Sequence, residues 1–170
     1  MSCNNAADNT LGVIEMQPIT VTVAITEEPD FVAPPDTVSS SFGVAENLMP
    51  GVQLLARSPV SASFALAFLC AHALECLLKA YLSKAGLSDA SLRNHATRHN
   101  LNALWASAAS QGLRIQATPP DWVTCLSGLH GPPSYFLRYA TGVHAIVSPG
   151  AEPMVSELLT ILEVVREQLR

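Results

Sequence analysis

A glutamate and a lysine stand four residues apart in the most apolar stretch of the chain, residues 64–82. On a helix this spacing places Glu75 and Lys79 on one face, and an acid that precedes its base is the favourable order for an ion pair. An exposed pair of this kind contributes only about 0.3–0.5 kcal/mol, but a helix this apolar could bury the pair in part. The two side chains could hold helix faces together, or Glu75 could face a polar cleft.

Two arginines and two histidines cluster farther along the chain. Arg93, His95, Arg98 and His99 stand close together in a chain of which only 14% of residues are charged. On a helix the histidines would share one face and offer two metal ligands, but no Cys, Asp or Glu stands nearby in sequence as a third, so we expect no metal. The segment could be a solvated turn in which His99 or Asn100 caps the next helix. It could also be an anion site that joins the arginines to that helix's N-terminus.

A third candidate is an arginine followed six residues later by a histidine. Arg138 and His144 could converge if the chain folds back at Gly142. An arginine would stabilise phosphate charge while a histidine moves a proton, which is the minimum needed to cleave RNA through its 2′-hydroxyl group. Arg138 could equally bind a carboxylate such as Glu75, with Tyr139 packed in the core.

The charge of the chain is unevenly divided. Residues 1–46 carry seven acidic residues and no lysine or arginine, whereas residues 47–170 carry all nine basic residues and the other seven acids, a net charge of +2. With a net charge of −5, the whole chain is not a globally basic nucleic-acid binder. It also lacks a P-loop and the G-x-G-x-x-G, G-x-S-x-G and H-E-x-x-H motifs. Phosphate chemistry would have to come from the clustered arginines and histidines.

Hydropathy patterns separate an extended arm from a helical body. Residues 19–26 alternate β-branched apolar residues with threonine and alanine, which predicts a β-strand. Residues 27–41 are acidic and proline-rich and predict a linker. We therefore expect an acidic, extended arm over residues 1–43 and an all-α domain over residues 44–170.

Helical periodicity and breaker residues divide that domain into elements. The helix expected to lie at its centre is rich in alanine and leucine and apolar on almost every side. We expect Gly86 and Gly112 to end helices, and Trp105 and Trp122 to lie in the core. The predicted helices span residues 44–56 with an interruption at Pro50-Gly51, then 60–85, 88–96, 99–111, 121–130 and 152–169.

The cysteines and the N-terminus indicate the cytoplasm. None of the four cysteines has C-x-x-C spacing, and reduced thiols are typical of the cytoplasm. The first residues lack the basic and apolar regions of a signal peptide. His72, Glu75 and Lys79 would be costly in lipid, so we expect a buried helix here and no membrane span.

Several of these residues together resemble the HEPN superfamily, the small helical domains of prokaryotic toxins, defence proteins and nucleotidyltransferase partners. The resemblance covers about residues 60–168 and rests on three short motifs. Glu75 precedes Lys79 by four residues in an apolar helix, and His99 begins a His-x-Leu-x-x-Leu pattern. Leu137-Arg138-Tyr139 then stands before a loop and a final amphipathic helix.

The resemblance implies an up-and-down bundle of four to five helices, often a homodimer. Many members are metal-independent RNases with an arginine, four to six residues and then a histidine, active at the dimer interface, and Arg138 and His144 fit that spacing. In active members this motif usually begins a regular helix, often with a polar residue after the arginine. Tyr139 and Gly142 depart from that pattern, which favours a binding role over catalysis.

We therefore predict a HEPN-like interaction or binding module that forms a homodimer and needs no cofactor. One alternative is a metal-independent RNase of toxin or defence type, with Arg138 and His144 catalytic. Another is a structural partner that binds through its N-terminal strand. The expected partners are RNA or a nucleotide, and an antitoxin or nucleotidyltransferase protein. The predicted cleft consists of Glu75, Lys79, Arg93, Arg98, His99, Arg138 and Tyr139.

Overall fold

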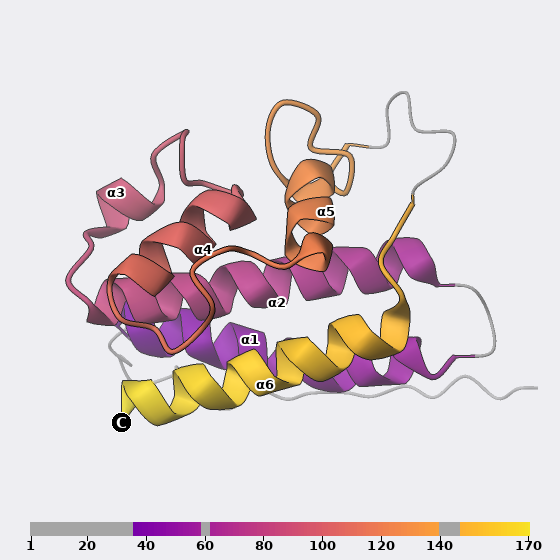
Figure 1. Ribbon diagram of the computed structural model, residues 1–170, viewed down its shortest axis with the longest axis horizontal. Coiled ribbons are helices and arrows are strands. Elements are labelled where there is room, and N and C mark those ends of the chain that lie inside the picture. The colour runs from indigo at the N-terminus through magenta and orange to yellow at the C-terminus, as the bar shows by residue number, and fades with distance from the viewer. Residues whose placement is uncertain (1–35, 59–61, 140–146) are drawn as a thin grey trace, which may run out of the picture. The chain divides into compact units, whose positions relative to one another are not determined.

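The computed structural model describes residues 36–58, 62–139 and 147–170, and this part of the chain is all-α, as predicted (Figure 1). The predicted strand at residues 19–26 lies outside the described residues. The helices are α1 (Thr37–Ala56), α2 (Ser63–Lys84), α3 (Asp89–Leu92), α4 (Leu101–Ser110), α5 (Asp121–His130) and α6 (Ala151–Leu169).

Helix α2 lies at the centre of this helical unit and contacts α1, α4, α5 and α6. Its alanine and leucine residues favour helix. Because the helix is apolar on almost every side, it can pack against neighbours all round. In Figure 1, α1 runs antiparallel to α2 and α6 lies alongside, whereas α5 stands across them. By length and composition α2 could cross a membrane, but most of it is buried inside the protein. We therefore describe α2 as the core helix of this unit.

Helix α1 begins well before residue 44, where the sequence predicted it to begin. The Asp36 side chain accepts a hydrogen bond of 2.7 Å from the backbone N–H of Ser39, which satisfies a donor that the helix itself leaves free. The run of serines that looked like a linker is thus the first turns of a capped helix. The predicted boundary between residues 43 and 44 falls inside α1.

The predicted interruption at Pro50-Gly51 is wrong, because α1 continues through both residues. A proline inside a helix removes one backbone hydrogen bond. Burial of Ala45, Met49 and Val52 against α2 compensates for that loss. A Cβ atom at Gly51 would lie 3.3 Å from Leu69 Cδ1, so the glycine allows α1 and α2 to approach closely.

The segment between α2 and α4 is less helical than predicted. Only Asp89–Leu92 is helical, and turns lead from there to Asn100. His95 therefore does not share a helix face with His99. The Asn100 side chain accepts a hydrogen bond of 3.1 Å from the N–H of Ala103 and caps α4, one of the two capping residues that the sequence offered.

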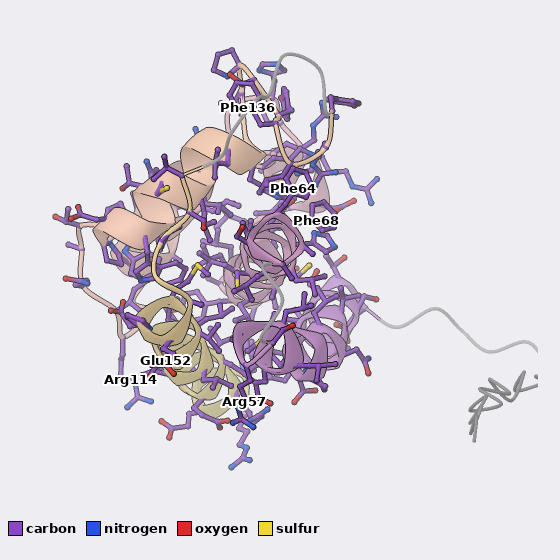
Figure 2. All side chains as sticks on the ribbon, turned by 90° about the vertical axis from the view of Figure 1, so that its right-hand side faces the viewer. Arg57, Phe64, Phe68, Arg114, Phe136 and Glu152 are labelled. Carbon is purple, nitrogen blue, oxygen red and sulfur yellow. The ribbon has the colours of Figure 1, made fainter. Side chains whose placement is uncertain are left out.

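Apolar side chains fill the space between the helices, and charged residues such as Arg57, Arg114 and Glu152 lie at the periphery (Figure 2). Trp105 and Trp122 are buried in this core, as predicted. The fully buried side chains include Leu74, Leu77, Leu78, Leu82, Leu101, Leu104, Leu126 and Leu158.

Replacing Pro50 with alanine is expected to stabilise the protein by about 2 kcal/mol. Proline inside a helix costs roughly 3 kcal/mol relative to alanine. Alanine also leaves the unfolded chain with more conformational freedom, which reduces the gain in the free energy of unfolding by up to about 1 kcal/mol. Urea unfolding measures the difference.

Pro153→Ala is the matched control, because Pro153 lies in the first turn of α6, where a backbone N–H has no helical partner. We expect it to change stability by less than about 1 kcal/mol. Equal effects of the two substitutions would contradict a continuous α1.

Candidate functional site

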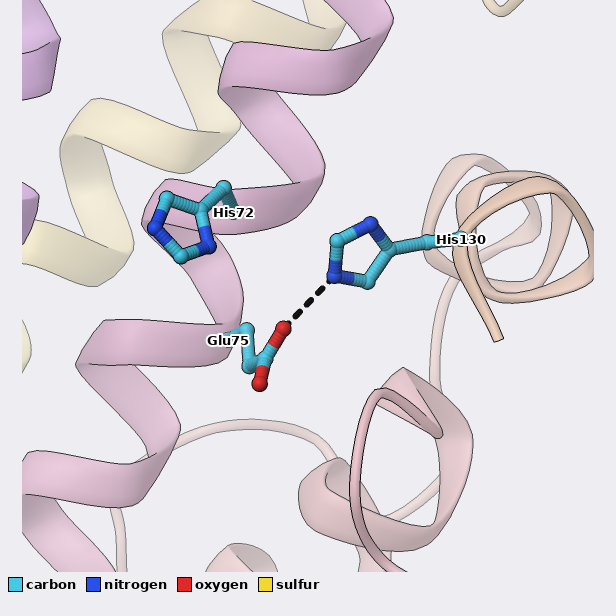
Figure 3. A group of neighbouring side chains, drawn as sticks. All are labelled: His72, Glu75 and His130. Carbon is cyan, nitrogen blue, oxygen red and sulfur yellow. Dashed lines mark hydrogen bonds and ion pairs between the residues drawn. The ribbon is translucent and has the colours of Figure 1, made fainter. Parts of the chain in front are cut away.

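The carboxylate of Glu75 is the meeting point of four basic side chains, although the residue is only 3% exposed. Lys79 Nζ lies 2.6 Å from Oε1. His130 Nε2 lies 2.6 Å from Oε2, a contact drawn as a dashed line in Figure 3. His99 Nδ1 lies 3.0 Å from both carboxylate oxygens. An Arg138 guanidinium nitrogen lies 3.7 Å from Oε2.

Three separate segments must reach α2 to build this cluster. His72, Glu75 and Lys79 follow one another at three- and four-residue steps, so α2 presents them as a polar stripe on an otherwise apolar helix. His99 comes from the turn before α4, His130 from the end of α5, and Arg138 from the turns that follow. A buried charge is tolerated only when it is paired and hydrogen-bonded, which these segments provide.

His99 is held in an uncommon backbone conformation, with φ at 65°. A non-glycine residue in this left-handed region is strained unless its surroundings hold it. The chain after α5 packs directly on it: a Cβ atom at Gly131 would lie 2.5 Å from the His99 carbonyl oxygen. The His99 ring also meets the rings of His130 and Tyr135 edge-on, with centroids 5.6 and 6.2 Å away.

His130 belongs to the cluster but was not predicted as a site residue. It is 0% exposed, and its Nδ1 is buried without a hydrogen-bond partner, as is Nδ1 of His72. The sequence shows His130 only as the last residue before a Gly-Pro-Pro break. A lone histidine at a helix end gives no signal that it donates to a glutamate 55 residues earlier.

The Nδ1 atom of His99 faces both Glu75 and Arg138, whose guanidinium nitrogen is 3.0 Å away. This atom cannot both donate to the carboxylate and accept from the guanidinium. An ionised carboxylate 3.0 Å away requires a proton on Nδ1, since a lone pair would be repelled. Arg138 is then held by attraction to the Glu75 charge.

These contacts keep Glu75 ionised. Burial alone would raise the pKa of its carboxyl group, but hydrogen bonds from His130, His99 and Lys79 outweigh burial and hold the pKa well below its usual value of 4.5. Burial lowers the pKa of His99 more than the Glu75 charge raises it, with Arg138 and His130 also lowering it. His99 is therefore neutral at pH 7.

A cavity of about 350 Å³ opens beside the cluster, between the start of α1, the polar stripe of α2 and α3. Glu75, Lys79 and Arg93 all line it. Cys76 also lines it, but burial raises the pKa of that thiol to about 11, so it is not an activated nucleophile. Arg93 is exposed and pairs with Asp89 at 2.9 Å.

The structure brings Glu75, Lys79, His99 and Arg138 together, while the other predicted residues lie around or beyond them. Arg93 lies across the cavity, and Arg98 is exposed on the turn before His99. Tyr139 is 63% exposed and does not pack in the core; its ring meets that of Tyr135 edge-on. His144 lies outside the described residues.

His72, Glu75 and His130 could in principle offer metal ligands, because their ligand atoms lie within 4.8 Å of one another (Figure 3). Two features of the cluster oppose a divalent cation. The positive charges of Lys79 and Arg138 already lie beside the carboxylate. The 2.6 Å between His130 and Glu75 suits a shared proton, and a metal ion would have to push the two atoms apart.

Comparisons with models of protein families, with curated proteins and with solved structures found no match to this chain.

Glu75→Gln is expected to destabilise the protein by about 3–5 kcal/mol at neutral pH. The substitution removes the negative charge of Glu75 and leaves the positive charges of Lys79 and Arg138 without their partner. Glu167→Gln, which removes an exposed partner of Arg114, should cost less than about 1 kcal/mol. Urea unfolding at several pH values measures both.

The difference between wild type and Glu75→Gln should depend on pH. Because the folded-state pKa of Glu75 is depressed, its contribution is complete above the unfolded value of 4.5 and declines as the pH falls below it. A difference that stays constant from about pH 7 to about pH 3 would contradict an ionised Glu75 at the centre of the cluster.

Proposed function

We propose that this chain is a HEPN-like helical binding module whose site takes a phosphate-bearing ligand, such as a nucleotide or an RNA strand. One observation carries this proposal: Lys79, His99 and Arg138 are oriented around a single buried carboxylate at the edge of a cavity. These are also the residues through which the sequence resembles the HEPN superfamily. The HEPN-like bundle and the homodimer belong to the same proposal.

The charge of the cluster favours an anion. Glu75 offsets only one of the two positive charges of Lys79 and Arg138, and at 3% exposure its carboxylate offers little surface to a ligand. The side chains of Lys79 and Arg138 remain 18% and 29% exposed. A lysine has three donors and an arginine five, so most of their N–H groups are available beyond the contacts to Glu75.

The geometry suits phosphate better than a single carboxylate. A guanidinium presents a planar fork that matches two phosphate oxygens, and a lysine adds a mobile point charge. Glu75 limits the freedom of both cations before a ligand arrives, which reduces the entropy that binding must overcome. Of the three basic side chains, Lys79 lines the adjoining cavity of about 350 Å³, which leaves room for the rest of a ligand that Lys79 contacts.

Binding of a fluorescein-labelled single-stranded RNA, measured by fluorescence anisotropy at several salt concentrations, tests this function. Arg138→Gln should weaken binding by about tenfold or more, since a hydrogen bond to a charged group contributes about 1.5–3 kcal/mol. It should also reduce the slope of log affinity against log salt by about 0.7, the value for one phosphate contact on a single strand.

Arg114→Gln is the matched control. Arg114 is an exposed arginine of the same unit that pairs with Glu167 and has no contact with the cluster. It should bind RNA as the wild type does. Equal losses in the two variants would contradict a site at Arg138, and absence of binding by the wild-type protein would contradict the proposed function.

A further inference from the structure

Tyr139 carries an aromatic ring that contributes little to the core. The chain has three tyrosines, and the structure describes all of them. Tyr81 is buried and donates its hydroxyl group to the carbonyl oxygen of Gln111, and the half-buried ring of Tyr135 contacts that of His99. Tyr139, in contrast, is 63% exposed, and its ring meets that of Tyr135 edge-on. Such a contact covers at most one face of a ring, so Tyr139 leaves an aromatic face open to solvent.

The turn that carries Tyr139 is held in place by hydrogen bonds and by a buried side chain. Leu137 is 4% exposed, and its backbone N–H donates to the carbonyl oxygen of Leu129 at 3.0 Å. The N–H groups of Arg138 and Tyr139 both donate to the carbonyl oxygen of Tyr135, at 2.8 and 3.0 Å. Tyr135 has a positive φ of 47°, a strain that persists only where the surroundings enforce it. Tyr139 is thus positioned before a ligand binds, which lowers the entropy cost of binding.

Arg138 and Tyr139 are neighbours in sequence, so their Cα atoms lie about 3.8 Å apart. The guanidinium of Arg138 lies 3.7 Å from the Glu75 carboxylate, whereas the ring of Tyr139 faces solvent. The cation to which we assign a phosphate and an open aromatic face therefore lie within the span of one nucleotide, in which a sugar joins a phosphate to a planar base. Stacking of a base on an aromatic ring is favourable for every base, because each has a π face.

We propose that Tyr139 is a stacking platform for a nucleobase, and that the ligand is therefore a nucleotide unit, free or within a single strand. Its phosphate binds Arg138 and its base stacks on Tyr139. This inference rests on the proposed function, because the phosphate contact brings the base to the ring. It disfavours inorganic phosphate and sugar phosphates, which have no base, and paired strands, whose bases are stacked on one another.

The test is displacement of the fluorescein-labelled single-stranded RNA from the full chain by unlabelled ligands, measured by fluorescence anisotropy. Adenosine 5′-monophosphate and ribose 5-phosphate are the matched pair, because they differ only in the base. We expect the mononucleotide to displace the RNA at a concentration at least about fivefold lower. An RNA affinity well above that of the mononucleotide would assign the site to a strand, and equal affinities would assign it to the free nucleotide.

Two substitutions of Tyr139 separate the ring from the hydroxyl group. Tyr139→Leu keeps an apolar side chain without a ring, so it should abolish the preference for the mononucleotide and weaken RNA binding by at least about fivefold. Tyr139→Phe is the matched control, because it keeps the ring, and it should bind as the wild type does. Stacking releases no counterions, so Tyr139→Leu should leave the slope of log affinity against log salt unchanged, whereas Arg138→Gln reduces it.

Equal displacement by the two ligands, or wild-type RNA affinity in Tyr139→Leu, would overturn the base contact and leave the proposed function intact. A loss of affinity in Tyr139→Leu together with a reduced salt slope would also overturn it, because the substitution would then act through Arg138. Absence of RNA binding by the wild-type protein would overturn both.

Discussion

A carboxylate inside a helical core must be surrounded by donors and positive charge, and this requirement connects the parts of the structure. Taking one ion out of water costs several kcal/mol, so Glu75 is stable only with its partners in place. Lys79 comes from the next turn of α2. The remaining partners come from the turn before α4, the end of α5 and the turns after it, which fixes where these segments lie against α2.

The same contacts that keep Glu75 ionised also hold its partners in place. The Glu75 charge orients His99 and Arg138 before any ligand binds, so the phosphate-bearing ligand that we propose would require little reorganisation of these side chains. Glu75 is a positioning residue, because it is buried and acts through the groups that it holds. Its removal would therefore disturb the fold and the cluster together.

Periodicity and spacing in the sequence predicted the all-α body, the central apolar helix, the buried tryptophans and the grouping of Glu75 with Lys79. Such features are local or follow from composition.

The full length of α1 was missed because its serine-rich start and Pro50 disfavour helix in the sequence, whereas packing against the rest of the protein stabilises helix there. His130 was missed because its contact with Glu75 depends on where α5 ends in space. Of the two interpretations of Tyr139, a cleft residue or a core residue, the structure contradicts the second, because the Tyr139 side chain is exposed. The homodimer, the partner proteins and the cytoplasmic location stay predictions.

The protonation of the His99 ring is the property on which the account of this site depends most directly. Two-dimensional nitrogen-15 NMR of the imidazole groups at about pH 7 distinguishes the two neutral tautomers and the cation. We predict a neutral His99 with its proton on Nδ1, directed at Glu75, and an unprotonated Nε2. A proton on Nε2 with Nδ1 bare, or a doubly protonated ring at that pH, would contradict the account.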